Sequence, residues 1–245
     1  MPNPQAVLVT GSGGRVGQAV CRALIERGHK VRGFDIRSTP GVEDSLTGDL
    51  SDFQALQRAT RGIEAVCHLA AVPDEDDFLS KLLPNNIVGL YHVLEACRLN
   101  GVKRFIFAST GQTVSGHAGP WPVTPEMPPT PRNWYASGKL LGEAAAQTYA
   151  HQYKMKNVSL RLGWCPRTSE HISQIKKWDF GQDIYLSPGD AGLLFACAVE
   201  TTVPFDHVVC FGTSKPLHHT RFCIASAKQY LGYEPQDAWP TGHDS

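Results

Sequence analysis

Residues 6–17 read AVLVTGSGGRVG, and this stretch determines the predicted fold class. Its first five residues form an apolar run that stops at glycines, which is typical of a buried parallel strand. Residues 16–27 then show helical spacing of apolar side chains, and Gly28 marks the end of that helix. A strand, a glycine-rich turn and a helix in this order predict a phosphate site, because a helix amino terminus presents free N–H groups and the positive end of its dipole.

The glycines of this turn are spaced G-x-x-G-x-x-G. This spacing permits a tight turn, a close approach of the backbone to a pyrophosphate, and close packing of the helix on the sheet. A glycine-rich turn without a ligand is the alternative interpretation. We expect a dinucleotide to contact the turn at Gly11, Gly14, Arg15, Val16 and Gly17.

Asp35 directly follows the second predicted strand, residues 31–34. A carboxylate at this place accepts hydrogen bonds from both hydroxyls of an adenosine ribose and repels a 2′-phosphate. We therefore predict NAD as the cofactor rather than NADP, although Arg37 is close enough in sequence to weaken that preference. A loop or capping role for Asp35 is the alternative.

Further strands and helices alternate along the chain as far as residue 162. This pattern predicts an α/β fold, a Rossmann-type doubly wound parallel sheet with helices on both faces. We assign residues 1–162 to a dinucleotide-binding core and residues 163–245 mostly to a small C-terminal substrate lobe, both within a single domain. The remaining expected elements are strands at 65–69, 104–108, 158–162 and 207–211, and helices at 52–59 with Ser51 as its N-cap, at 84–100 beginning with Pro84, at 134–153, at 188–199 and at 220–231.

Tyr135 and Lys139 form a Y-x-x-x-K pair within the predicted helix 134–153. Residues at i and i+4 share one helix face, so the ammonium lies beside the phenol. A free tyrosine has a pKa of about 10, which must fall by roughly two to three units for the phenol to act as a base near neutral pH. The lysine and an oxidised nicotinamide supply positive charge for this purpose. A solvated Tyr–Lys pair is the alternative.

The predicted strand 104–108 leads into Ser109 and Thr110. Ligands bind at the carboxyl ends of parallel strands in such sheets. We therefore expect Thr110 to position the reacting oxygen of a substrate for Tyr135, with Ser109 beside it; a strand-end cap is the alternative. The Pro-rich segment 116–131 is expected to form an ordered loop over the site that includes His117, or otherwise a rigid surface connection.

Composition excludes several classes of function. Lys+Arg and Asp+Glu both number 23 in 245 residues, so no excess charge favours a nucleic acid or an anionic membrane. No apolar run is long enough to span a bilayer. The seven cysteines lack C-x-x-C and zinc-ligand spacing, so we expect no metal site and a reducing, cytoplasmic location.

These residues together resemble the extended short-chain dehydrogenase/reductase family, also called the NAD-dependent epimerase/dehydratase family. The resemblance covers nearly the whole chain. It implies that Tyr135 is the catalytic base, that Lys139 holds a cofactor ribose and lowers the tyrosine pKa, and that Thr110 is the third catalytic member. It also implies cofactor contacts at Asp49, Leu50, Leu69, Ala70, Ala71 and Asn86.

Within that family the chain is most similar to the short uronate dehydrogenases, which oxidise a sugar acid at its anomeric carbon. Those enzymes bind the substrate carboxylate with an arginine, and the spacing between Cys165 and Trp178 puts Gln174 at that position. An amide does not replace a bidentate arginine–carboxylate contact. We therefore favour a neutral aldose or polyol over a uronate, with Gln112, Trp164 and Gln174 as further substrate contacts.

The leading hypothesis is an NAD-dependent dehydrogenase that acts on a hydroxyl of a small sugar or polyol. An epimerase or dehydratase that retains its NAD is the first alternative, and a non-catalytic dinucleotide sensor is the second. Apart from a small-molecule substrate, the partner that the resemblance implies is a second copy of the chain, in a homodimer or higher homo-oligomer paired through helices near 87–99 and 140–149. Residues 176–179 are expected to form a solvated loop, with a substrate lid as the alternative.

Overall fold

The central element of the computed structural model, which describes residues 3–202 and 204–243, is a parallel β-sheet. Within those residues the sheet has seven strands in the order β3-β2-β1-β4-β5-β6-β7. After the edge strand β3 the chain crosses back over β2 and β1 to form β4 on the other side of β1. The strand order therefore reverses between β1 and β4. The strands are β1 (Ala6–Thr10), β2 (Lys30–Asp35), β3 (Asp44–Thr47), β4 (Ala65–His68), β5 (Arg104–Thr110), β6 (Lys156–Leu162) and β7 (His207–Gly212).

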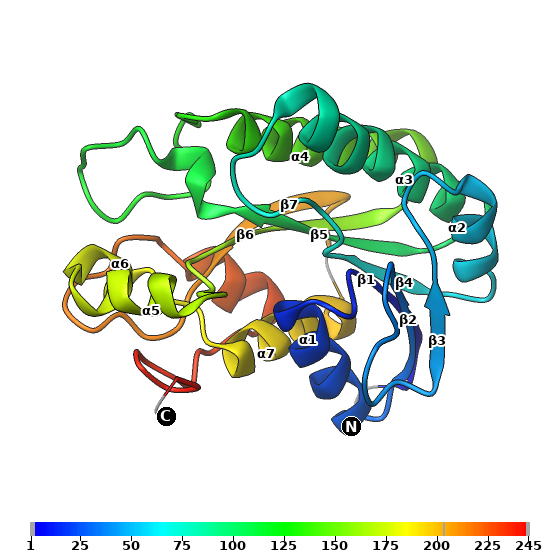
Figure 1. Cartoon of the computed structure of the whole chain (residues 1–245), viewed down its shortest axis with the longest axis horizontal. Helices are drawn as coiled ribbons and strands as arrows, with labels where there is room; N and C mark the ends of the chain where they lie inside the picture. The colour runs from blue at the N-terminus through cyan, green and yellow to red at the C-terminus, as the bar shows by residue number, and fades with distance from the viewer. Residues whose placement is uncertain (1–2, 203, 244–245) are drawn as a thin grey trace.

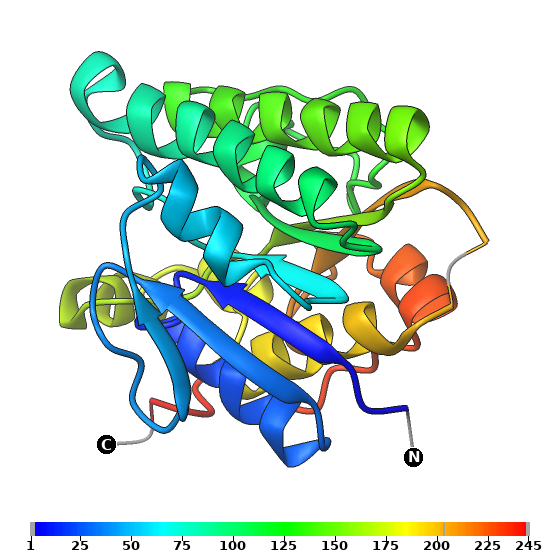
Figure 2. The same ribbon diagram turned by 90° about the vertical axis from the view of Figure 1, so that its right-hand side faces the viewer.

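Helices cover both faces of the sheet (Figures 1 and 2), as the doubly wound prediction requires. One face carries α1 (Arg15–Glu26) and α7 (Pro188–Glu200), which pack against each other. The opposite face carries α2 (Phe53–Ala59), η1 (Phe78–Val88), α3 (Gly89–Leu99) and α4 (Trp134–Tyr153). Each face has its own core of fully buried apolar side chains, because a strand between two helical layers is buried on both sides.

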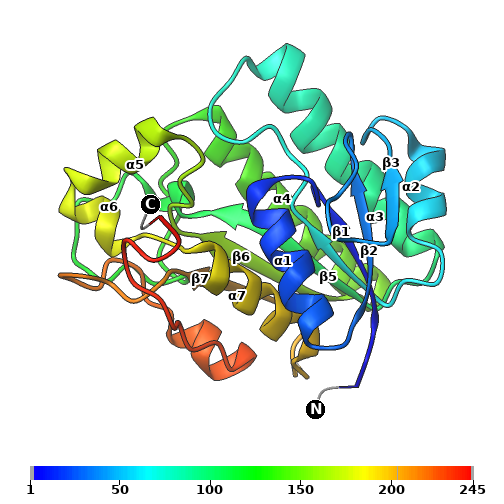
Figure 3. The ribbon, with the colours of Figure 1, turned by 60° about the horizontal axis from the view of Figure 1, so that its bottom comes forward.

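Several short helices lie beyond one end of the sheet (Figure 3). They are η2 (Gly111–Val114), α5 (Ser169–Lys176) and α6 (Asp179–Asp183), while η3 (Ala227–Leu231) packs near α7 and β7. The Pro-rich segment is held by the bond from Gly116 N to Thr130 O and by pairing of Val123 with Phe222. The C-terminal part of the chain therefore supplies both the walls at this end and, through α7 and β7, part of the sheet and its helical layer.

Three predicted element starts are wrong. The side chain of Asp52, not Ser51, caps α2, because its carboxylate accepts from Ala55 N at 2.9 Å. Pro84 lies inside a helix that already starts at Phe78, where wider i to i+5 bonding lets the chain pass a residue without an N–H. The helix expected at 220–231 is shorter, because residues 221–223 bond to Val123 in extended conformation.

Strand β3 and helices α5 and α6 were not predicted. β3 reads DSLT, an edge strand without apolar alternation, and α5 and α6 are short and mostly polar. Within residues 176–179, expected as a solvated loop, Lys177 and Trp178 link the end of α5 to the start of α6. Among the described residues, no helix is long and apolar enough to cross a membrane.

Candidate active site

A cavity of about 1120 Å³ lies at the carboxyl ends of the strands, between the turn before α1 and the rings of Trp164 and Trp178. Nearly all residues assigned to the site from the sequence line this one space. They are Gly11, Gly14, Arg15, Val16, Gly17, Asp35, Asp49, Leu50, Leu69, Ala70, Ala71, Ser109, Thr110, Gln112, Tyr135, Lys139, Trp164 and Gln174. Asn86 is the exception. It is buried behind the wall and holds the backbone of Val72, accepting from its N–H at 2.8 Å and donating to its carbonyl at 3.0 Å.

The turn between β1 and α1 has no room for a side chain at Gly11 or Gly17. A Cβ on Gly17 would lie 2.1 Å from Gly11 O, and one on Gly11, where φ is +73°, would lie 2.6 Å from Ala70 N. Gly14 is the N-cap of α1, and no side chain caps this helix. The first N–H groups of α1 are thus open toward the cavity, at the positive end of the helix dipole. This arrangement fits a pyrophosphate.

Asp35 closes the far end of the cavity at the end of β2. Its two carboxylate oxygens accept hydrogen bonds from Gly13 N at 3.0 Å and from Arg37 N at 3.1 Å. Each oxygen retains a lone pair for a further donor such as a ribose hydroxyl. Asp49 lies on the same wall, and hydrogen bonds from Ser51 lower the pKa of its carboxyl.

Lys139 and Tyr135 extend from the first turns of α4, which Asn133 caps by accepting from Ala136 N at 2.8 Å. The Lys139 ammonium donates to Ala108 O at 2.8 Å and lies 5.7 Å from the centre of the Tyr135 ring. Burial lowers the pKa of Lys139 to about 8. The pKa of Tyr135 is raised to about 12, first by burial and then by the charge of Asp74.

Thr110 stands at the end of β5, on the same cavity wall as this pair. Its hydroxyl oxygen accepts from Gln112 N at 3.2 Å, which leaves the hydroxyl hydrogen for a ligand in the cavity. Ser109 differs, because its hydroxyl donates to Glu143 Oε1 at 2.6 Å. Glu143 in turn holds Arg161 by two hydrogen bonds of 2.9 Å in the buried layer under α4.

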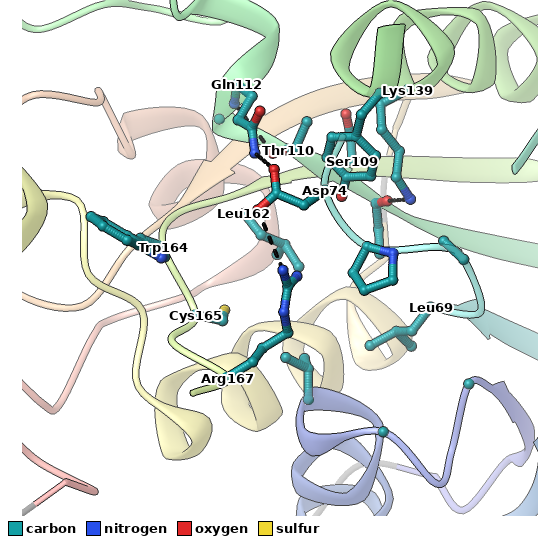
Figure 4. A pocket seen from close by; sticks show the side chains of 18 of the residues that line it. Leu69, Asp74, Ser109, Thr110, Gln112, Lys139, Leu162, Trp164, Cys165 and Arg167 are labelled. Carbon is teal, nitrogen blue, oxygen red and sulfur yellow. Dashed lines mark hydrogen bonds and ion pairs between the residues drawn. The ribbon is translucent and has the colours of Figure 1, made fainter. Parts of the chain in front are cut away.

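Asp74 and Arg167 are cavity residues that the sequence analysis missed. The Asp74 carboxylate accepts from Gln112 Nε2 at 3.0 Å through one oxygen and from Arg167 at 3.3 Å through the other. Figure 4 shows Asp74 between these two side chains, in the middle of the cavity. Gln112 is itself held by Asn133, whose amide donates to it at 2.8 Å. The place of Asp74 shortly after β4, at the same edge as Thr110, is the signal that would have found it.

The remaining predicted contacts lie at the far wall. Trp164 and Trp178 meet edge to face, with 5.8 Å between ring centres. Gln174, on α5, is exposed and donates to Glu170 at 3.3 Å. His117 lines the cavity from the Pro-rich loop and donates to Pro128 O at 2.9 Å. Within the described residues no three His, Cys, Asp or Glu side chains are grouped so as to hold a metal ion.

A family model for the NAD-dependent epimerase/dehydratase family matches residues 7–164, which contain the turn, Asp35, Thr110 and the Tyr–Lys pair. The chain belongs to this family. The fold and the arrangement of the cavity agree with that membership, because the family's cofactor, NAD, needs the open helix terminus and the carboxylate found here.

Individual members of the family are similar over nearly the whole chain. The NAD-dependent glucose-6-phosphate dehydrogenase of Haloferax volcanii is 31% identical, with 95% of this chain and 94% of the relative covered. A uronate dehydrogenase of Pseudomonas syringae pv. tomato is 33% identical, with 95% and 82% covered. The crystal structure of the glucuronic acid dehydrogenase from Chromohalobacter salexigens superposes with a TM-score of 0.79 at 28% identity, covering 97% of this chain and 86% of that one.

Proposed function

We propose that the protein is an NAD-dependent dehydrogenase that oxidises a hydroxyl group of a small, neutral sugar or polyol. The observation that carries this proposal is the presence of Thr110, Tyr135 and Lys139 on the wall of one cavity that continues to the open terminus of α1. That combination joins a dinucleotide site to a proton acceptor.

The residues of the cavity fit NAD. The open N–H groups of α1 would hold the pyrophosphate, and Asp35 would accept hydrogen bonds from the adenosine ribose. The Lys139 ammonium, buried beside Tyr135, would hold the second ribose. Bound NAD supplies the hydride acceptor.

Tyr135 would take the proton from the reacting hydroxyl, while Thr110 donates to that oxygen and orients it. In the NAD-free protein the phenol of Tyr135 stays protonated at neutral pH and cannot accept a proton, because burial and the charge of Asp74 raise its pKa to about 12. Positive charge must therefore lower this pKa before the reaction, and Lys139 together with the oxidised cofactor provides it. Proton abstraction is thus coupled to cofactor binding.

We favour a neutral substrate because Gln174 stands at the position where an arginine is expected in uronate dehydrogenases. The two relatives described above are named for glucose 6-phosphate and for uronate, both anionic sugars, whereas another relative, 28% identical over 94% of this chain, is named for the neutral sugar L-arabinose. Here Gln174 is exposed and bonded to Glu170, and the arginine that enters the cavity, Arg167, is paired with Asp74. The aromatic rings of Trp164 and Trp178 suit the apolar face of a sugar ring.

The experiment is to follow NADH formation with NAD or NADP over a panel of aldoses, polyols, uronates and sugar phosphates. We expect turnover with NAD on a neutral sugar and none in Tyr135→Phe, whose affinity for NAD should stay close to that of the wild type. Tightly retained cofactor without net NADH would favour an epimerase or dehydratase. Bound NAD, with neither turnover nor sugar conversion, would favour a sensor.

We also propose a homodimer and a cytoplasmic location. Helices α3 and α4 lie side by side on one face (Figure 2), and they expose Tyr91 and Leu141, at 58% and 52% of their surface. Light scattering should give twice the mass of one chain, and charged substitutions at both Tyr91 and Leu141 should reduce the measured mass to that of one chain.

The free and mostly buried cysteines suit a reducing compartment. The division into a core, residues 1–162, and a substrate lobe, residues 163–245, stays a prediction.

A further inference from the structure

Asp74 occupies a position that the proposed reaction does not require. It lies in the loop after β4, with φ of +73°, a left-handed backbone conformation that aspartate and asparagine tolerate better than most residues. Tyr135, Thr110 and Lys139 can perform the proton transfer without it. Its negative charge raises the pKa of Tyr135 and so disfavours the phenolate that accepts the proton, and its presence in the cavity therefore calls for another role.

The carboxylate is fixed in place but still open to a ligand. Gln112 holds one oxygen and Arg167 holds the other, and Asn133 holds Gln112. The Asp74 side chain nevertheless remains 46% exposed, on the cavity wall. The backbone N–H of Glu75 also donates to the oxygen that Gln112 holds, at 3.2 Å. A carboxylate has about four acceptor positions, of which these contacts use three. The remaining position, on the oxygen that Arg167 holds, is able to accept a hydrogen bond from a substrate hydroxyl.

The charges around Asp74 disfavour an anionic ligand. Arg167, whose guanidinium reaches the middle of the cavity, is already paired with Asp74 (Figure 4). Arg132 also lines the cavity, but it is exposed, where water and salt screen its charge. A carboxylate or phosphate placed here would have to displace Asp74 from Arg167 or lie close to a like charge.

We infer that Asp74 determines substrate class: it binds a hydroxyl group of a neutral polyhydroxylated substrate and excludes sugars that carry a carboxylate or phosphate. Arg167 and Gln112 act as positioning residues for this carboxylate. The inference rests on the proposed dehydrogenase function and deepens it. Specificity of this kind comes as much from the repulsion of competitors as from attraction of the substrate.

The test compares matched sugars, glucose with glucuronate and galactose with galacturonate, in the wild type and in Asp74→Asn. Asparagine keeps the shape and accepts the backbone conformation, and it replaces one carboxylate oxygen by an NH2 group, so the variant removes the charge and the acceptor capacity of one oxygen. In the pair that gives the higher activity, we expect the wild type to have a higher kcat/KM for the neutral sugar than for the uronate. In Asp74→Asn, kcat/KM for the neutral sugar should fall by about 10- to 100-fold, mainly through KM, as expected for the loss of a hydrogen bond to a charged group. The ratio of kcat/KM for the neutral sugar to kcat/KM for the uronate should fall by a similar factor.

Asp76→Asn is the matched control, because it removes the same charge from the same loop at an exposed residue outside the cavity wall. It should leave the preference unchanged. A wild type that prefers the uronate, or an unchanged preference in Asp74→Asn, would overturn the inference.

A failure of the proposed function is distinguishable from a failure of this inference. If the wild type oxidises no sugar, the proposed function is refuted. The discrimination between neutral and anionic sugars is then measured by the rise in melting temperature that each sugar gives in the presence of NAD. Stabilisation by the neutral sugar alone, lost in Asp74→Asn, would still support the role of Asp74. Equal stabilisation by both members of a pair, or by neither, would overturn it.

Discussion

Replacing Lys139 by methionine should stabilise the NAD-free protein at neutral pH while abolishing its activity. The ammonium is buried, donates one hydrogen bond, to Ala108 O, and lies 5.0 Å from the centre of the Phe107 ring. Burial lowers the pKa of Lys139 from 10.5 to about 8. At about 1.4 kcal/mol per pKa unit, holding this charge in the folded protein costs about 3 kcal/mol at pH 7. Methionine fills a similar volume without that cost.

The pH dependence has a definite sign. Below pH 8 the lysine is protonated in both the folded and the unfolded protein, so the full cost is present. Between about pH 8 and 10.5 the unfolded chain holds more protons, so the stability of the wild type rises relative to that of Lys139→Met. The advantage of the variant should therefore shrink across this window.

The assay is urea unfolding of both proteins at pH values from 7 to 10, with Lys103→Met, at an exposed lysine, as the control. The control should give the same difference from the wild type at every pH. Equal stability of Lys139→Met and the wild type at pH 7, or an advantage that persists at pH 10, would refute the reasoning. Equal stability at pH 7 would mean that the Lys139 ammonium keeps its hydration in the folded protein. An advantage that persists at pH 10 would mean that methionine stabilises the fold through packing and not through removal of the charge.

Three further predictions concern the cofactor site and the layer beneath it. Asp35→Asn should weaken NAD binding by about 10- to 100-fold and narrow the preference over NADP, as measured by cofactor titration; an unchanged preference would contradict the ribose contact. Gly17→Ala should abolish NAD binding, because its Cβ would lie 2.1 Å from Gly11 O; wild-type affinity would show that the turn adjusts. Glu143→Gln should lower the free energy of unfolding by about 3–5 kcal/mol, since it leaves Arg161 buried and unpaired; a loss below about 1 kcal/mol would indicate access of water.

Much of the fold follows from local patterns. Strands β1, β4 and β5 contain continuous apolar runs, residues 6–9, 65–67 and 105–108, because they are buried on both faces, and such runs can be recognised without a structure. Strand β3 was not predicted because it is a polar edge strand. Residues 220–224 lie outside the helix in which the sequence placed them, because the pairing of Phe222 with Val123, distant in sequence, overrides their local preference.

The candidate site divides in the same way. The turn before α1 and the Tyr135–Lys139 pair depend on spacing within one turn or helix, so the sequence alone predicts them. The contact between Asp74 and Arg167 joins the loops after β4 and β6, which no local pattern connects. Asn86 resembles a cofactor residue in sequence, whereas its amide is used by the backbone of Val72.

The central claim is transfer of hydride from a sugar carbon to NAD with Tyr135 as the base. The most direct test uses sugars and polyols that carry deuterium on the carbon of the reacting hydroxyl and follows the label by mass spectrometry. We predict that the label appears in the reduced cofactor, in an amount equal to the oxidised sugar, and that Tyr135→Phe gives neither product. Label that stays in the sugar while its configuration changes, with no net reduced cofactor, would contradict the dehydrogenase account.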